Sequence, residues 1–328
     1  MIFSEKPSRS RVIIILTIGI FSIATASILI RLANEAAGIK TLGFSLVLAA
    51  SRLTLAALIL VPSWGKIEWD KLQKNAIIYA ILAGISLALH FALWITSLSY
   101  TTIAASTTLV TTNPIWVALI SWWWLGEKIS LRQIIGITIA LLGAMTIGLS
   151  DLDTSKVGNP QIFGDILALI ASVAASFYLL LGREAQRQGL SINGYITIAY
   201  SSAAIVLLPL PFLCQTPYTG YPFIVYIYIL LTALIPQMIG HTSFNWAMRW
   251  LSPTLVTLAI LFEPLGASFL GYLLFREIPS PMVLVGAPLL LLGIAIVGLK
   301  PQTDKMRSVC YNDYKKSDKI CTSPVERK

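Results

Sequence analysis

The sequence predicts an all-α integral membrane protein in which ten transmembrane helices form two inverted five-helix repeats. Three observations lead to this fold class. The 328 residues are 56% hydrophobic and only 12% charged, which is about half the charge of an average soluble domain. Long apolar segments recur along the chain. A pattern of proline, glutamate and glycine also occurs twice, at a fixed spacing.

Ten apolar segments approach the length that a helix needs to cross the hydrocarbon core, which is roughly 20 residues. Most connections between them are short, so consecutive helices are expected to form antiparallel hairpins. The expected spans are Val12–Ile30, Leu42–Val61, Ala76–Leu98, Thr102–Trp124, Ile134–Leu149, Ile162–Leu181, Tyr195–Leu213, Phe223–His241, Thr254–Phe275 and Met282–Leu299.

The first apolar segment begins like a secretory signal peptide. Basic residues precede it, and Ala24-Thr25-Ala26 resembles a cleavage site. The apolar run nevertheless continues past Ala26 to Ile30, which makes it long enough to span the bilayer. We therefore interpret this segment as an anchor helix.

The positive charges predict the orientation of the chain. If the N-terminal residues 1–11 are cytoplasmic, most Lys and Arg residues fall on the cytoplasmic side, including those of the tail. Arg52 lies within a span, and the cations that fall outside are Arg31, Lys40, Lys156 and Arg276. This bias predicts that both termini are cytoplasmic and that residues 150–161 form an outer loop. The polar tail, residues 300–328, is expected to be disordered.

This orientation also accounts for the formal net charge of +9 without a nucleic-acid partner. The expected partners are the lipid bilayer, in the form of the plasma membrane, and a small-molecule substrate. A homodimer is left open. The spacing of the three cysteines suggests neither a disulfide framework nor a metal site, and we expect no cofactor and no metal.

The repeat is visible in two stretches. TTNPIWVALISWWWLGEKIS covers residues 111–130, and LFEPLGASFLGYLLFREIPS covers residues 261–280. Their prolines are related by 264 − 114 = 150, and the same offset joins Glu127 to Glu277. It also pairs Gly136, Gly143 and Gly148 with Gly286, Gly293 and Gly298. The repeat predicts two halves, 12–149 and 162–299. Because each half holds an odd number of spans, the second half enters the membrane with the opposite orientation, as in many secondary transporters.

With these two stretches and SRLTLAALIL at 51–60, the chain resembles the EamA-type carriers of the drug/metabolite transporter superfamily from about Val12 to Leu299. Arg276 departs from the family pattern, because a glycine usually precedes the glutamate there. The resemblance implies a ten-helix carrier of small metabolites, often an exporter. We expect a secondary transporter that works by alternating access and exports amino acids or related amphipathic compounds, while nucleosides and amphipathic drugs stay open.

Two residue pairs in the repeat are candidates for function. Pro114 and Pro264 are expected to bend the fourth and ninth helices, because proline leaves a backbone carbonyl unpaired. The bends either shape the bundle or flex as the halves move. Asn113 and Glu263 precede the prolines. An ionisable group at membrane depth is costly and functional by default, so Glu263 is expected to face a cavity and bind substrate or a proton. The alternative is a hydrogen bond between helices.

Further polar residues recur at helical spacing. Gln237, His241 and Asn245 are four residues apart on the eighth helix, as are His90 and Trp94 on the third, and this spacing places each set on one face. His241 lies near the predicted cytoplasmic end of its span, which weakens its candidacy. The residues that we expect to border one central cavity and bind substrate are His90, Trp94, Asn113, Gln237, Asn245 and Glu263.

Proton coupling is assigned to Glu263 and His90. Histidine titrates near neutral pH, although a buried and satisfied histidine is an equal alternative for His90. Glu263 is the carboxylate placed nearest the middle of a span, where low dielectric disfavours its charged form. Such a group could load and release a proton as the cavity opens to alternate sides.

Other polar residues have simpler interpretations. Ser172 and Ser176 on the sixth helix are expected to pack against a close neighbour, and packing is also favoured for Tyr178. Glu277 is expected to cap the helix that follows it. Arg52 could snorkel, pair with a carboxylate or bind an anionic substrate group, and the family resemblance favours a shared structural role.

Two other classes of protein are weighed against a carrier. Asp151-Leu152-Asp153 resembles the DxD metal site of enzymes that act on lipid-linked substrates, but its loop is short, so a solvated acidic loop is the preferred interpretation. No metalloprotease or nucleotide-binding motif is present. Inverted repeats also allow a channel or a scramblase, although no filter-like motif is repeated. Turnover that saturates with substrate would separate a carrier from a channel.

Overall fold

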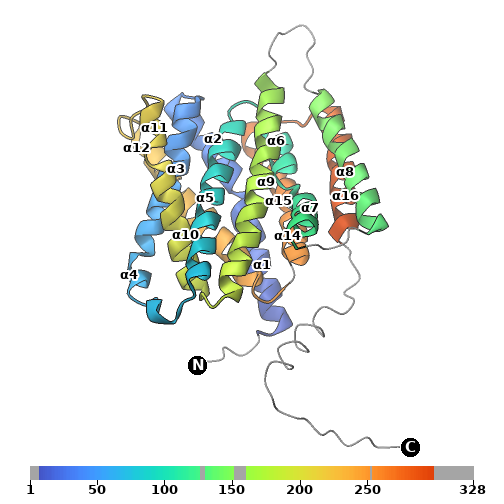
Figure 1. Cartoon of the computed structure of the whole chain (residues 1–328). Helices are drawn as coiled ribbons and strands as arrows, with labels where there is room; N and C mark the ends of the chain where they lie inside the picture. The colour runs from blue at the N-terminus through green and yellow to red at the C-terminus, as the bar shows by residue number, and fades with distance from the viewer. Residues whose placement is uncertain (1–6, 126–129, 151–159, 252, 299–328) are drawn as a thin grey trace, which may run out of the picture. The chain divides into compact units, whose positions relative to one another are not determined.

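A computed structural model describes residues 7–125, 130–150, 160–251 and 253–298 (Figure 1). Within these ranges every regular element is a helix. Seven helices in this part of the chain are long and apolar enough to cross a membrane, and Leu131–Gly143 and Pro281–Ile296 are shorter apolar helices. The protein is therefore an all-α, multi-pass membrane protein. Glu127 and the Asp151-Leu152-Asp153 loop lie outside the described residues.

The first half contains five helical spans. They are α1 (Arg9–Ala24) with α2 (Ala26–Ala37), α3 (Leu42–Ile59), α5 (Lys74–Ser97), α6 (Ile103–Val110) with α7 (Asn113–Leu125), and α8 (Leu131–Ser150). The short α4 (Val61–Trp64) and the 3-10 helix η1 (Trp69–Lys71) connect the second span to the third.

The second half repeats this order. Its spans are α9 (Pro160–Arg187), α10 (Ile192–Leu207) with α11 (Leu210–Leu213), α12 (Phe223–Thr232) with the π-helix η2 (Ala233–His241) and α13 (Thr242–Ala247), α14 (Pro253–Ile260) with α15 (Glu263–Phe275), and α16 (Pro281–Gly298). The fourth and ninth spans have the same helix boundaries when shifted by 150 residues.

Three spans are longer than the hydropathy pattern predicts. The first continues past Ile30 to Ala37, the sixth to Arg187 and the eighth to Ala247. Hydropathy marks the part of a helix that can face lipid. The polar ends of these spans still form helix, because the backbone hydrogen bonds of a helix do not depend on a hydrophobic surface.

The two halves pack against each other with the symmetry of the repeat. The third span, α5, packs along the sixth span, α9. In the same way the eighth span packs on the first, where α12 contacts α2 and η2 contacts α1. The fourth span packs on the sixth, and the ninth on the first. These six spans surround the centre of the protein, while α8 and α16 pair with each other beside them (Figure 1).

The α8–α16 pair relies on repeat-related glycines. A Cβ atom on Gly143 would lie 2.4 Å from the backbone nitrogen of Leu290, and one on Gly293 would lie 2.4 Å from that of Ala140. Small residues allow helix backbones to approach closely in membranes. The glycines that revealed the repeat in the sequence therefore join its two copies.

Gly143→Ala is expected to lower the thermal unfolding midpoint of the purified protein. The added methyl group meets backbone rather than a side chain that could move aside, and overpacking of this kind costs about 1–3 kcal/mol. Gly65→Ala is the matched control, because nothing lies within 4 Å of the Cβ position there. Equal unfolding midpoints for the two variants would contradict the close packing of α8 and α16.

Arg276 shows why the family pattern has a glycine at this position. It is the C-cap of α15 and has φ 55° and ψ 27°, in the left-handed region that side chains with a Cβ disfavour. Arg276→Gly is expected to raise the free energy of unfolding by up to about 1 kcal/mol, and therefore to raise the unfolding midpoint slightly. Arg276→Ala keeps the Cβ and should give no gain, so a gain in the alanine variant would argue against backbone strain.

Candidate substrate-binding site

Two spans are interrupted at equivalent positions. α6 ends at Val110 and α7 begins at Asn113, while α14 ends at Ile260 and α15 begins at Glu263. Each proline is thus the second residue of a new helix, where its missing N–H costs no hydrogen bond. The sequence predicted bends at Pro114 and Pro264. The structure has breaks there instead, because the helix ends before each proline.

Hydroxyl groups from the sixth span hold the first break. Ser172 donates a hydrogen bond to Oδ1 of Asn113 at 2.7 Å and accepts one from Thr112 at 2.9 Å. The Trp116 indole donates to the Thr112 hydroxyl at 3.0 Å. Polar side chains on neighbouring helices commonly satisfy the groups exposed by a broken membrane helix. The packing role expected for Ser172 is consistent with these contacts.

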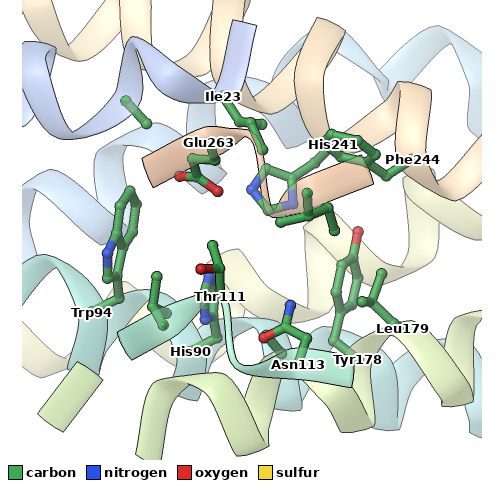
Figure 2. A pocket seen from close by; sticks show the side chains of 14 residues that line it. Ile23, His90, Trp94, Thr111, Asn113, Tyr178, Leu179, His241, Phe244 and Glu263 are labelled. Carbon is green, nitrogen blue, oxygen red and sulfur yellow. The ribbon is translucent and has the colours of Figure 1, made fainter. Parts of the chain in front are cut away.

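A cavity lies between the two breaks (Figure 2). Six spans contribute to its wall, three from each half. The lining residues are Ile23, Ala26, His90, Trp94, Val110, Thr111, Asn113, Ala175, Tyr178, Leu179, His241, Phe244, Ile260 and Glu263. Three pairs of these residues are related by the repeat offset of 150. They are Val110 with Ile260, Asn113 with Glu263, and Trp94 with Phe244. In Figure 2, Glu263 and His241 lie on one side of the cavity, and His90 and Asn113 lie on the opposite side.

Four of the six residues proposed from the sequence line this cavity, namely His90, Trp94, Asn113 and Glu263. Gln237 and Asn245 are buried but do not line it. Gln237 accepts a hydrogen bond from Nε of Arg52 at 3.0 Å, and Asn245 donates to the Tyr178 hydroxyl. Both residues therefore lie behind the cavity wall, in contact with other spans.

Gln237 and His241 lie on η2, one turn apart along its axis, and they have different neighbours. Gln237 contacts Arg52 of α3, whereas His241 lines the cavity. Pro236 lies inside η2, and it is the sequence signal that could have indicated an irregular turn.

His241 and Tyr178 are the lining residues that sequence reasoning ranked too low. His241 appeared close to the end of its span, but the eighth span continues to Ala247, so His241 lies further from its end. Tyr178 was assigned to packing, and it both lines the cavity and accepts a hydrogen bond from Asn245. The ring centroids of Tyr178 and His241 are 6.3 Å apart.

His90 is both held in place and exposed to the cavity. Its Nδ1 lies 3.0 Å from the carbonyl oxygen of Ala171, so Nδ1 carries the proton in this contact. In the neutral ring Nε2 is then left as an acceptor. The ring stacks on Trp94 at 6.0 Å between centroids. His90 can therefore accept a proton or a hydrogen bond from a ligand without losing its anchor.

A polar network joins both halves at one end of the spans. Arg31 forms an ion pair with Glu277 at 3.7 Å, and Glu277 accepts a hydrogen bond from the N–H of Ile103 at 2.6 Å. Arg31 also donates to the carbonyl of Thr101, whose hydroxyl donates to Asp165 at 2.8 Å. Glu277 thus caps α6, in the other half, rather than the helix that follows it as expected.

The wall combines apolar, aromatic and polar side chains. Its titratable or hydrogen-bonding groups come from Glu263, His90, His241 and Asn113, and its rings from Trp94, Tyr178 and Phe244. Among the described residues, no cluster of three or more His, Cys, Asp or Glu side chains could hold a metal ion.

Two helical repeats that enclose a central cavity are typical of one class of protein, the polytopic membrane transporters. The model of the EamA-like transporter family matches residues 8–149 and 162–299. The chain belongs to this family and is a membrane transporter.

Its relatives are similarly named. The chain is 24% identical over 256 residues to the uncharacterized transporter YyaM of Bacillus subtilis (strain 168), covering 75% of this chain and 82% of the relative. It is 24% identical over 191 residues to a probable terminal-alkyne amino-acid exporter of Streptantibioticus cattleyicolor, covering 58% of this chain and 62% of the relative. A crystal structure that is 18% identical has the same fold, with a TM-score of 0.58 over 88% of this chain and 96% of that chain.

Proposed function

We propose that the protein is a secondary transporter that exports amino acids or related amphipathic compounds from the cytoplasm by alternating access. The observation that carries this proposal is the cavity between two repeat-related helix breaks, with Glu263 on its wall. Discontinuous helices near the midplane form the substrate sites of many transporters with inverted repeats. One relative is named as a probable amino-acid exporter, which supports the direction and the substrate class.

The proposed orientation places both termini in the cytoplasm and the protein in the plasma membrane. The end of the spans that carries Arg31 and Glu277 is then the outer end. The network of Arg31, Thr101, Ile103, Asp165 and Glu277 ties the first, fourth, sixth and ninth spans together there. This conformation is therefore closed to the outside, and transport requires that these contacts break.

We propose that Glu263 releases a proton when a polar group of the substrate binds to it. It is 7% exposed and is the carboxylate on the cavity wall among the described residues. The other titratable groups of the wall are His90, His241 and Tyr178, and Arg52 interacts electrostatically with Glu263. In this proposal Glu263 carries a proton in one state of the cycle and releases it when a cationic or hydrogen-bonding group of the substrate binds.

The test compares metabolites in medium and cytoplasm of cells with and without the protein. Compounds that accumulate in the medium only with the protein are then assayed in proteoliposomes for saturable counterflow. We expect one or more small amphipathic compounds to pass both steps. Flux that rises linearly with concentration would indicate a channel or a scramblase, and chemical conversion of a lipid-linked substrate would indicate an enzyme.

A further inference from the structure

A buried cation next to the cavity has unused hydrogen-bond donors. Arg52, in α3, is fully buried. Its Nε donates to Gln237, and its guanidinium carbon lies 4.1 Å from the centroid of the Phe91 ring. In the described part of the chain, however, both Nη atoms of Arg52 and Nε2 of Gln237 are buried without a hydrogen-bond partner. The pair therefore presents several N–H groups that need an acceptor.

The unmatched donors of Arg52 carry a positive charge. A buried charge is expensive unless it is paired and hydrogen-bonded, yet no described carboxylate forms an ion pair with Arg52 within 4.0 Å. Glu263 interacts with Arg52 electrostatically from a longer distance. If Glu263 carries a proton, as proposed for one step of transport, this interaction loses its charge and an incoming anion becomes the counter-ion of Arg52.

The guanidinium is linked to the cavity through the contacting rings of Phe91 and His241. Phe91 stacks on Arg52, and its ring centroid is 5.2 Å from that of His241, which lines the cavity. Gln237 belongs to the π-helix that also carries His241. A rotation of His241 or a change in this irregular turn would connect the guanidinium to the cavity.

We propose that the Nη atoms of Arg52 and Nε2 of Gln237 bind the carboxylate of the transported compound. This inference rests on the proposed function and restricts the substrate class to carboxylates, including amino acids. The guanidinium is planar and matches two oxygens of one carboxylate. If the compound is an amino acid, its ammonium group then interacts with the carboxylate of Glu263 on the cavity wall. Arg52 thereby acts as a substrate-binding residue rather than as a purely structural cation.

Ligand-dependent thermal stabilisation of the purified full-length protein tests this assignment. The probes are L-leucine, L-phenylalanine and L-threonine, their carboxamides, and inorganic phosphate. For wild type, at least one amino acid should stabilise the protein at a concentration about tenfold or more below that of its amide, because hydrogen bonds to charged groups contribute about 1.5–3 kcal/mol. Phosphate should stabilise it less than that amino acid.

Gln237→Glu is the informative variant, because the new carboxylate can pair with Arg52 and occupy it. It should keep or raise the unfolding midpoint without ligand, while the preference for acid over amide falls at least tenfold. Arg52→Gln should lose the same preference. Arg249→Gln, which removes an exposed cation, is the matched control and should behave as wild type.

The outcomes separate the two proposals. Loss of the acid preference in Gln237→Glu, with the fold intact, supports the carboxylate site. An unchanged preference in that variant overturns it, as does equal stabilisation by acids, amides and phosphate, or no stabilisation by any amino acid. If the compounds found by the metabolite comparison are neutral or cationic and show saturable counterflow, the carboxylate assignment fails while the transporter function stands.

Discussion

Glu263→Gln is expected to abolish substrate accumulation driven by a pH gradient in proteoliposomes. Glutamine keeps the shape of glutamate and most of its hydrogen bonding but cannot exchange a proton. The side chain is buried, lines the cavity and begins α15 at the second helix break. Binding and energy-independent exchange should survive, because the cavity retains its other lining groups. The measurement is uptake against a concentration gradient, with the pH gradient imposed in either direction.

Glu35→Gln is the control for this experiment. Glu35 is an exposed carboxylate near the end of α2, and its loss should leave coupled transport unchanged. Full gradient-driven transport by purified Glu263→Gln would show that Glu263 is structural. If wild type itself ignores the pH gradient, the protein is a uniporter or uses another ion, and the coupling proposal fails at an earlier step.

Glu277→Ala is expected to open the proposed outer end. The change removes both the ion pair with Arg31 and the acceptor for the N–H of Ile103. Hydrogen bonds to charged groups contribute about 1.5–3 kcal/mol, so the open population should rise by about tenfold or more. The readout is the alkylation rate of Ile260→Cys, a cavity position, by an impermeant maleimide added outside, with the three native cysteines replaced by serine.

Glu184→Ala provides the matched control, because Glu184 forms an ion pair with Arg187 at 3.4 Å within α9 rather than between the halves. It should leave the alkylation rate unchanged. Equal rates in wild type and Glu277→Ala would mean that the network does not close the cavity. Faster alkylation only from the cytoplasmic side would reverse the proposed orientation.

The repeat could be predicted from the sequence because its signals are local and rare. Proline and glycine impose backbone geometry wherever they occur, so their recurrence at a fixed offset predicted matching helices in the two halves. The structure places those helices at matching boundaries, and Gly143 and Gly293 meet the backbone of the opposite copy. The same 150-residue offset identified Asn113 and Glu263 as equivalent candidates, and both line the cavity.

The positions of Gln237, His241 and Asn245 could not be obtained in this way. Spacing of four residues predicts a shared face, but residues one turn apart on a face can have different neighbours, as Gln237 and His241 do in η2. A single proline, Pro236, is compatible with a kink, a break or a π-helix. The choice among them depends on how the eighth span packs against α1 and α3.

The sequence by itself determined the class of protein, the spans, the repeat and the pair of residues at the helix breaks. These features depend on apolar length and on backbone constraints, which each segment carries alone. Only the tertiary structure decided that Arg52 meets Gln237, that Tyr178 and His241 enter the cavity, and that Glu277 caps α6. Such contacts join residues up to 185 positions apart, and they are fixed by how helices from the two halves approach each other.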